Sequence, residues 1–269
     1  MDFHYGLNLP TKEPESELHL LEGIGGGILG GILAGNVPVC AVEIEEYRRE
    51  ILLQRQRDGI LPRFPIWDDV KTFNGMEWRG KIDIISGGFP CQDISIAGKG
   101  QGITGNRSGL WKDMARIVNE IRPKYVFIEN SPEILRRGVE TVFEDLAKMG
   151  YDAVWGILGA RHLGASHKRD RFWCLAYPMQ IRVQGFRDHQ KNTIEVQTFW
   201  KSIENANSFW NGGNPTKSNS LHQRTISGVD DGIPHGVDRI KAIGDAQVPQ
   251  VACLAFTWLK SLIKEGEEL

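Results

Sequence analysis

The feature that most constrains the fold is a regular alternation, between residues 18 and 178, of short apolar runs with longer helical patterns. Runs rich in β-branched and aromatic residues predict strands, while apolar positions three and four residues apart predict helices. We expect strands at 18–22, 37–43, 82–86, 125–129, 153–159 and 172–176, and helices at 28–34, 45–57, 110–121 and 132–149. This alternation predicts an α/β fold with a mostly parallel sheet covered on both faces.

The pattern changes near Pro178, beyond which Asn, Ser, Thr, Gly and Gln are frequent and no apolar period is sustained. A chain of 269 residues holds one large domain, or one domain with a small partner. We expect a large domain of residues 1–178 plus 240–269 and a small, irregular domain of residues 179–239. A plain polar insertion is the alternative for the small domain. A helical pattern returns at 248–263, and we expect this helix to pack near the first glycine-rich turn.

The balance of charge limits what the chain can bind. It has 32 Lys and Arg against 34 Asp and Glu, a net charge of -2, which excludes a uniformly basic nucleic-acid coat. Local basic faces stay open, because the segments 98–124 and 161–191 are rich in Lys and Arg. The first segment contains Lys99, Arg107, Lys112, Arg116, Arg122 and Lys124. We expect such residues to neutralise phosphates, with a solvated charged face as the alternative.

Cysteine usage and hydropathy indicate where such a chain works. The 4 cysteines are far apart and form no Cys-x-x-Cys pair, so neither a disulfide framework nor a metal site is expected. No apolar run approaches the length of a membrane span, and the polar N-terminal residues do not resemble a signal peptide. We therefore expect a cytoplasmic protein that needs neither a metal nor a membrane.

A glycine-rich turn at residues 20–30 follows the first predicted strand and opens a helix. Gly25, Gly27 and Gly30 fit the pattern GxGxxG, and Glu43 lies at the end of the next predicted strand. Such a turn lets a ligand approach the main chain at a helix N-terminus. The turn alone predicts a nucleotide-like cofactor and leaves NAD, FAD and S-adenosylmethionine open. A glycine-rich turn without a ligand is the alternative.

Cys91 lies in the sequence GGFPCQ, at residues 87–92, directly after the predicted strand 82–86. The carboxyl end of a central strand is where open α/β sheets place their active sites. Its neighbours, Pro90 and a polar loop, argue against burial in the core, so Cys91 is a candidate nucleophile.

This loop resembles the nucleophile loop of the DNA cytosine-5 methyltransferases, of the bacterial and phage modification type. Further motifs follow in the order of that family. The stretch 21–35 resembles its cofactor motif, and Glu43 and Asp69 match acids that in the family contact the ribose and the adenine amine. Glu129-Asn130 resembles Glu-Asn-Val, HKRDR at 167–171 resembles Gln-x-Arg-x-Arg, and GDAQVPQ at 244–250 resembles Gly-Asn-Ala-x-x-Pro. The resemblance covers residues 18–178 and about 237–263.

The chain departs from the family pattern at a few positions. Glu22 stands where Ser or Ala is usual, Ser131 replaces a valine, His167 replaces a glutamine and Asp245 replaces an asparagine. None of these changes touches the nucleophile or the key acid. His167 and Asp245 leave open how the segments that carry them are held.

The resemblance implies a large domain of the S-adenosylmethionine-dependent methyltransferase (Rossmann-like) fold with a small target-recognition domain. Its cofactor is S-adenosylmethionine, its product is S-adenosylhomocysteine, and no metal is required. The implied cofactor-binding residues are Glu22, Gly23, Ile24, Gly25, Gly26, Glu43, Ile44, Asp69, Val70, Gly88, Pro90, Asp245 and Ala246.

The implied catalytic residues are Cys91, Glu129, Arg169 and Arg171. A thiolate that adds to C6 of cytosine activates C5 for methylation and can later leave. Glu129 must then stabilise the ring near N3, which requires a raised pKa; a structural cap of the following turn is its alternative. Arg169 and Arg171 alternate along a segment that we expect to be extended, so that both point to one side and orient the base. A solvated strand edge is the alternative for these arginines.

The expected substrate is duplex DNA, from which the target cytosine must be flipped out. Residues Gln92, Ser95, Lys99 and Arg107 are expected to contact DNA from the loop after the nucleophile, and Arg182, Arg187 and Arg224 from the small domain. We expect a monomer in the cytoplasm of a bacterium or a phage-infected host, with a cognate restriction enzyme as a further partner.

Other functions stay open at this point. An RNA cytosine-5 methyltransferase of the same family would use the same chemistry, and a catalytically silent DNA-binding relative would keep the fold. A nicotinamide dehydrogenase is a third alternative, based on GxGxxG alone, but it has no use for the loop that carries Cys91.

Overall fold

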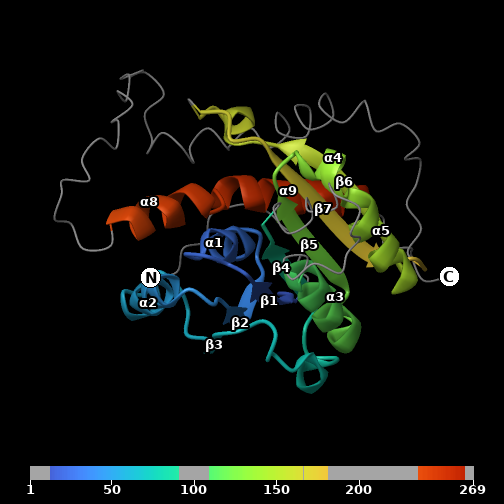
Figure 1. The fold of residues 1–269 in the computed structure, drawn as a ribbon, viewed down its shortest axis with the longest axis horizontal. Coiled ribbons are helices and arrows are strands. Elements are labelled where there is room, and N and C mark those ends of the chain that lie inside the picture. Colours follow the sequence, from blue (N-terminus) through green and yellow to red (C-terminus); the bar gives the residue numbers. More distant parts are fainter. Residues whose placement is uncertain (1–12, 91–108, 166, 181–235, 264–269) are drawn as a thin grey trace.

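The computed structural model describes residues 13–90, 109–165, 167–180 and 236–263, which form a 7-stranded sheet flanked by helices (Figure 1). The strand order is β3-β2-β1-β4-β5-β7-β6. The strands are β1 (Ser16–Leu20), β2 (Val37–Val42), β3 (Ile66–Trp67), β4 (Ile84–Gly88), β5 (Tyr125–Asn130), β6 (Tyr151–Leu158) and β7 (Arg171–Pro178). Strands β1 to β5 are parallel, and β7 is antiparallel to both β5 and β6. The expected α/β fold and mostly parallel sheet are confirmed.

The helices follow the predicted positions with two differences. They are α1 (Gly26–Leu33), α2 (Glu46–Arg57), α3 (Gly109–Ile121), α4 (Ile134–Arg137), α5 (Val139–Lys148), α8 (Gly236–Asp245) and α9 (Pro249–Leu262), with 3-10 turns η1 (Gly75–Trp78) and η4 (Ala160–Leu163). The single helix expected at 132–149 is broken at Gly138, whose φ of 135° no helix accommodates. Helix α8 begins in a stretch that was expected to be irregular, and the expected domain boundary at residue 239 falls within it.

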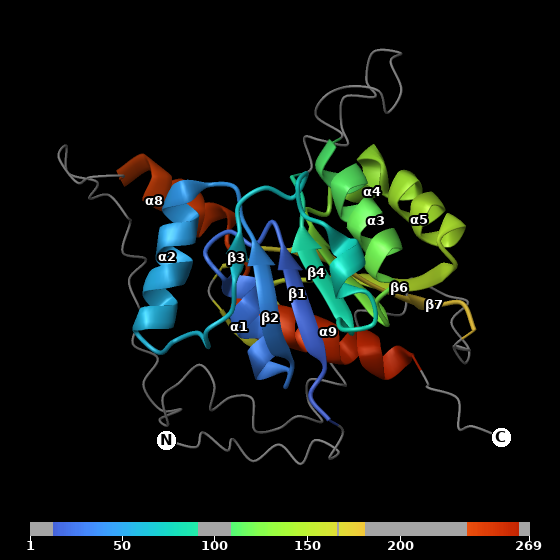
Figure 2. The ribbon, with the colours of Figure 1, turned by 90° about the horizontal axis from the view of Figure 1, so that it is seen from below.

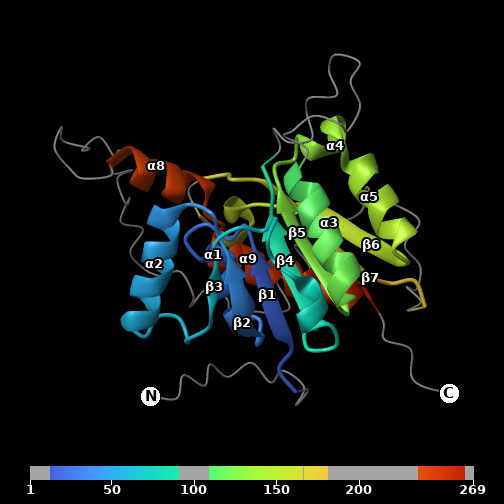
Figure 3. The same cartoon turned by 60° about the horizontal axis from the view of Figure 1, so that its bottom comes forward.

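Helices cover both faces of the sheet, as expected (Figures 2 and 3). On one face, α3 and α5 bury Met114, Ile117 and Val142 against strand residues such as Ile128. On the other face, α9 buries Leu254, Ala255 and Trp258 against β5, β6 and β7. No helix in the described ranges is long and apolar enough to cross a membrane.

The strand order reverses between β1 and β4. From β1 the chain proceeds outward through β2 and β3, and it then returns to β4 on the other side of β1. Loops diverge at such a switch point, and ligands bind there at the carboxyl ends of the strands. The glycine-rich turn leaves β1 and the segment that leads to Cys91 leaves β4, so both leave the sheet at this switch point.

Helix α9 packs against α1, which confirms the expectation for 248–263. A Cβ added to Gly30 would stand 2.6 Å from the Cβ of Ala252, and one added to Gly26 would stand 2.2 Å from the carbonyl oxygen of Gln247. Only glycine permits main chains to approach this closely. The C-terminal helix therefore forms one wall beside the glycine-rich turn.

Candidate active site

The described residues that were predicted to bind a cofactor gather at one edge of the sheet. They occupy the loops that follow the parallel strands β1, β2, β3 and β4 and the junction between α8 and α9. They are Glu22, Gly23, Ile24, Gly25, Gly26, Glu43, Ile44, Asp69, Val70, Gly88, Pro90, Asp245 and Ala246.

Two acids hold the glycine-rich turn. Glu22 accepts a hydrogen bond at Oε1 from the main-chain N–H of Ile28, at 2.8 Å, in the first turn of α1. Glu43 accepts one at Oε2 from the N–H of Gly23, at 2.6 Å, and one at Oε1 from the N–H of Glu45, at 3.0 Å. Gly23 and Gly25, with φ of 65° and 89°, are where the chain turns. The ends of β1 and β2 are thereby fixed to each other.

A buried cluster under this turn was not predicted. The Nδ1 atom of His19 lies 2.8 Å from Oγ of Ser86 on β4, 3.6 Å from Oε2 of Glu22 and 3.8 Å from Oε1 of Glu17. Burial alone would lower the pKa of His19, but the negative charges of Glu17 and Glu22 outweigh it and raise the pKa. The acids that flank His19 on an otherwise apolar strand are the signal in the sequence that could have indicated this cluster.

The loop after β3 carries Asp69 and Val70. Asp69 Oδ1 accepts a hydrogen bond from the N–H of Lys71, at 2.9 Å, and the Val70 side chain is buried in the core. Nearby strand ends expose apolar surface, since Ile44 is 57% and Trp67 is 46% exposed. An acid beside exposed apolar side chains suits a flat ring that carries an amine.

Glu129 lies at the end of β5, opposite Gly88 of β4. Its Oε1 forms an ion pair with Nε of Arg171 at 2.8 Å. Burial raises the pKa of Glu129 to about 7, against the attraction of Arg171 and Arg169, and the charge of Glu22 raises it further. A Cβ on Gly88 would stand 2.7 Å from Oε2 of Glu129, so glycine is needed there to leave room for the carboxyl group.

The segment around Arg169 differs from the expectation. Arg169 has a φ of 40°, in the left-handed region, so the segment is not extended and the two arginines do not share one role in the fold. Arg169 donates from Nη2 to the carbonyl of Gly244 at 2.7 Å and to that of Ala246. Arg171, two residues later and the first residue of β7, faces Glu129 because β7 pairs antiparallel with β5. Arg169 thus holds the junction before α9, and Arg171 holds the carboxyl group.

Asn130 connects the end of β5 to the segment that leads to Cys91. It donates from Nδ2 to the carbonyl of Phe89 at 2.8 Å and accepts at Oδ1 from the N–H of Ser131 at 2.8 Å. Pro90, the next residue after Phe89, is exposed. The following predicted site residues lie outside the described ranges: Cys91, Gln92, Ser95, Lys99, Arg107, Arg182, Arg187 and Arg224.

The junction between α8 and α9 approaches the glycine-rich turn from the other side. Asp245 accepts from Nη2 of Arg48, on α2, at 2.6 Å. A Cβ on Gly27 would stand 2.8 Å from Oε1 of Gln247, and one on Gly88 would stand 3.5 Å from its Nε2. Gln247 therefore reaches from the α1 turn toward the end of β4. In the sequence Gln247 stands at a variable position of the motif at 244–250, so the motif carries no signal for this contact.

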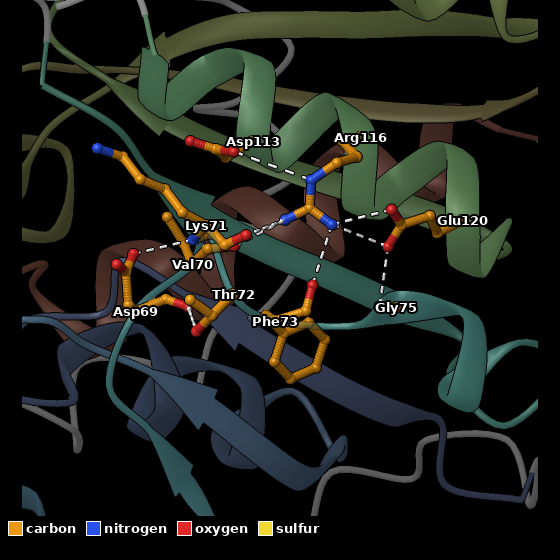
Figure 4. A network of polar contacts seen from close by, with 9 residues as sticks. All are labelled: Asp69, Val70, Lys71, Thr72, Phe73, Gly75, Asp113, Arg116 and Glu120. Carbon is orange, nitrogen blue, oxygen red and sulfur yellow. Dashed lines mark hydrogen bonds and ion pairs between the residues drawn. The ribbon is translucent and has the colours of Figure 1, made fainter.

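Arg116 was expected to neutralise phosphates, and the structure corrects this. Its guanidinium forms hydrogen bonds to carbonyl groups of the loop 70–73 and to Glu120, one turn further along α3 (Figure 4). The charge of Glu120 offsets that of Arg116, and the donors are used within the fold.

No group of three metal-ligating side chains occurs in the part of the chain that the structure describes. The expectation that no metal is needed stays a prediction.

Comparison with known proteins identifies the class that this fold and site define. Residues 16–250 match the model of the C-5 cytosine-specific DNA methylase family, and the chain belongs to that family.

Two relatives illustrate the range of similarity. The chain is 36% identical over 198 residues to the type II methyltransferase M.CviJI of Paramecium bursaria Chlorella virus IL3A, which covers 70% of this chain and 52% of the relative. It is 33% identical over 125 residues to the type II methyltransferase M.HhaI of Haemophilus parahaemolyticus, which covers 45% of this chain and 38% of the relative. The chain thus spans about half the length of the viral relative and less than half the length of the bacterial one.

Solved structures share the fold. The Dnmt2 methyltransferase of S. pombe superposes with a TM-score of 0.53 at 21% identity, over 69% of this chain and 54% of that one. A putative DNA modification methyltransferase encoded within an E. coli prophage gives a TM-score of 0.51 at 23% identity, over 63% of this chain and 49% of that one.

Proposed function

We propose that the chain is a DNA (cytosine-5) methyltransferase that uses S-adenosylmethionine and attacks C6 of a flipped-out cytosine with Cys91. The observation that carries this proposal is Glu129, which stands at the end of β5, opposite the strand that leads to Cys91, and whose pKa is raised to about 7 by burial. A group that is partly protonated near neutral pH can both donate and hold a proton.

The other cysteines support Cys91 as the nucleophile. Burial raises the pKa of Cys40 and of Cys253 to about 11, and it raises that of Cys174 as well. A thiol, unlike a thiolate, is a poor nucleophile. Each of these side chains lies in or against the core, whereas Cys91 follows the carboxyl end of a central strand, where reactive groups are placed.

In the proposed reaction the Cys91 thiolate forms a bond to C6, and the electron pair of the C5–C6 double bond is displaced into the ring. Protonated Glu129 donates to N3, which receives the developing charge. When bound, the cofactor supplies an electrophilic methyl group and leaves as S-adenosylhomocysteine. The ring electron pair at C5 forms the bond to this methyl group. The C5 proton then passes to water, N3 returns its proton to Glu129, and expulsion of the Cys91 thiolate restores the C5–C6 double bond. Arg171, at 2.8 Å from Glu129, orients the carboxyl group throughout.

The side chains at the edge fit S-adenosylmethionine. Glu43, beside the N–H of Gly23, would accept from the ribose hydroxyls, and Asp69 would accept from the adenine amine, next to apolar Ile44. Glu22 adds an argument against a dinucleotide. Its carboxylate already occupies the N-terminus of α1, where a pyrophosphate would bind, and it would repel that anion but not a sulfonium cation.

The remaining parts of the proposal depend on residues outside the described ranges. Duplex DNA is the proposed substrate, contacted by Gln92, Ser95, Lys99 and Arg107 on one side and by Arg182, Arg187 and Arg224 on the other. We further propose the division into residues 1–178 plus 240–269 and a recognition domain of residues 179–239. A monomer in the cytoplasm, with a cognate restriction enzyme as partner, completes the proposal.

The test is base-resolution methylation sequencing of DNA from a methylation-free bacterial host that expresses the chain or its Cys91→Ser variant. We expect 5-methylcytosine at one short motif in the first culture and none in the second. Methylation by both would exclude Cys91 as the nucleophile. Its absence from both would contradict the proposal.

A second assay separates DNA from RNA as substrate. Purified chain is given cofactor with a tritiated methyl group and either duplex DNA or RNA of the same host. Transfer to DNA is expected, and transfer to RNA alone would replace the proposed substrate while the chemistry is retained.

A further inference from the structure

Arg116 of α3 holds the loop that carries Asp69 (Figure 4). From Nη2 it donates to the carbonyl of Val70 at 2.8 Å, and from Nη1 to the carbonyl of Phe73 at 3.0 Å. One planar guanidinium thus connects both sides of a tight turn. A lysine could not reach separate acceptors in this way, because its donors share one nitrogen atom.

Glu120 completes the arrangement from the next turn of the same helix. It accepts from Nη1 of Arg116 at 2.9 and 3.0 Å, and its Oε2 also accepts from the main-chain N–H of Gly75 at 2.8 Å. Asp113, one turn earlier, lies 3.8 Å from Nε of Arg116. The loop is therefore attached to α3 at Val70, Phe73 and Gly75.

The orientation of Asp69 depends on the same turn. Its Oδ1 accepts from the N–H of Lys71 at 2.9 Å, and its carbonyl accepts from the N–H of Thr72 at 3.1 Å and from the hydroxyl of Thr72 at 3.0 Å. Among the described residues the carboxylate of Asp69 accepts the hydrogen bond from Lys71 at Oδ1, and its Oδ2 is left for a ligand. Any rotation of the turn that Arg116 holds would move the carboxylate with it.

We propose that Arg116 is a positioning residue for recognition of the adenine ring: it holds the loop 70–73 so that Asp69 accepts a hydrogen bond from the 6-amino group. This inference rests on the proposed function, because it takes the adenosine part of the cofactor as the ligand. It adds a role that acts through Asp69 and does not touch the reacting atoms.

Calorimetry with two ligands tests the proposal. S-adenosylhomocysteine carries the 6-amino group, and S-inosylhomocysteine carries an oxygen in its place, which cannot donate to Asp69. We expect the intact chain to prefer the first by about tenfold or more, the range for a hydrogen bond to a charged group. Asp69→Asn should abolish most of this preference, because an amide can also donate to the oxygen.

Arg116→Gln should bring the affinity ratio close to one, and Arg116→Lys should give an intermediate ratio. Arg122→Gln is the matched control, since Arg122 is a cation just after α3 that contacts the Tyr151 ring instead of the loop. Its ratio should equal that of the intact chain. If Arg116→Gln does not fold, the lysine variant alone carries the test.

Two results would overturn the inference. In the first, the Arg116 variants weaken both ligands equally and keep the preference, which is the behaviour of a purely structural residue. In the second, the intact chain binds both ligands equally, so that Asp69 does not read the amine. Binding of neither ligand by the intact chain contradicts the proposed function itself, and the two failures are thereby distinguished.

Discussion

Two carboxylates at the same edge of the sheet, Glu43 at the end of β2 and Glu129 at the end of β5, are held in opposite ways. Glu43 accepts main-chain N–H groups with both oxygens, at 2.6 and 3.0 Å. Glu129 has an arginine at 2.8 Å, and burial raises its pKa to about 7. Glu43, although only 3% exposed, is fixed in place by main-chain donors, whereas burial of Glu129 outweighs the attraction of its arginines and lets it exchange a proton near neutral pH. Under the proposed function, one residue type thus serves cofactor binding at Glu43 and proton transfer at Glu129.

Glu22 combines features of both. One oxygen accepts the N–H of Ile28, as in a held carboxylate, while the other is buried without a hydrogen-bond partner among the described residues and lies 3.6 Å from His19. Its charge contributes to the raised pKa of Glu129. Glu22 therefore connects the two halves of the edge electrostatically.

The largest expected effect comes from replacing Glu129, the proposed proton donor. Glu129→Gln should lower the rate of methyl transfer by about 10²- to 10⁴-fold, the usual contribution of a positioned acid. Cofactor affinity should change little, because Glu129 pairs with Arg171 and is not among the residues proposed to bind the cofactor. Tritium transfer and calorimetry measure the two quantities.

Glu133→Gln serves as the control for this variant, because Glu133 is an exposed acid shortly after β5. It should leave the rate unchanged. A rate for Glu129→Gln within a few-fold of the intact chain would mean that Glu129 takes no part in proton transfer.

A large loss of stability is expected when His19, under the glycine-rich turn, is replaced. His19→Gln leaves Glu17 and Glu22 buried without a positive partner, and breaking a buried pair in this way costs about 3–5 kcal/mol of unfolding free energy. The pKa of His19 is raised in the folded state, so its contribution is complete below the unfolded pKa and is lost as the pH rises through the folded pKa. Urea unfolding at several pH values should show the difference shrinking in alkaline solution.

His167 provides the comparison, since its side chain is exposed and His167→Gln should leave the unfolding free energy unchanged. Equal stability of the two variants would show that the buried acids are not balanced by His19.

Replacing Glu43, the proposed acceptor for the ribose hydroxyls, should change the affinity for the cofactor rather than the rate of methyl transfer. Glu43→Gln keeps one oxygen acceptor and loses the charge, so the affinity for S-adenosylhomocysteine should fall by roughly 10- to 100-fold, the range for a hydrogen bond to a charged group. The rate at saturating cofactor should stay within about twofold of the intact chain. Glu45→Gln, at an exposed neighbour, should change neither quantity. A fall in the rate alone would reverse the assignment of the two acids.

The smallest effect is a shift in pH dependence. Because the charge of Glu22 raises the pKa of Glu129, Glu22→Gln should lower that pKa. If protonated Glu129 is the active form, the rate falls as the pH rises through its pKa, and in Glu22→Gln this fall should begin at a lower pH. Glu17→Gln, which also removes a buried charge near His19, should leave the profile in place. Identical profiles for all three chains would mean that Glu22 does not act on Glu129.

The sequence predicted the elements that consist of long apolar patterns, and it predicted the acids at strand ends. The carboxyl ends of parallel strands meet at one edge, so Glu43 and Glu129 could be brought together without coordinates, whereas Asp69 came from the resemblance to the family alone. Strand β3 has 2 residues, which is too short for any period to be recognised. The break at Gly138 depends on a backbone angle that a glycine permits but does not require.

The partners of the site residues could not be predicted for a different reason. The contact of His19 with Ser86 joins two strands that are adjacent in the sheet but far apart in sequence, and it depends on their register. Arg116 contacts the loop 70–73 only because α3 lies over it. A count of basic residues therefore assigned Arg116 to phosphates, because such a count contains no information on what each side chain faces.

The close contact between α1 and α9 has a consequence for the order of events during synthesis. Gly26 and Gly30 are translated early, before most of the sheet, while Gln247 and Ala252, which pack against them, are translated after the strands that the structure describes. The glycine-rich turn acquires its second wall only when α9 has left the ribosome. A nascent chain interrupted before Gln247 would carry the glycine-rich turn without the residues that pack against it, so under the proposed function it would have no competent cofactor site.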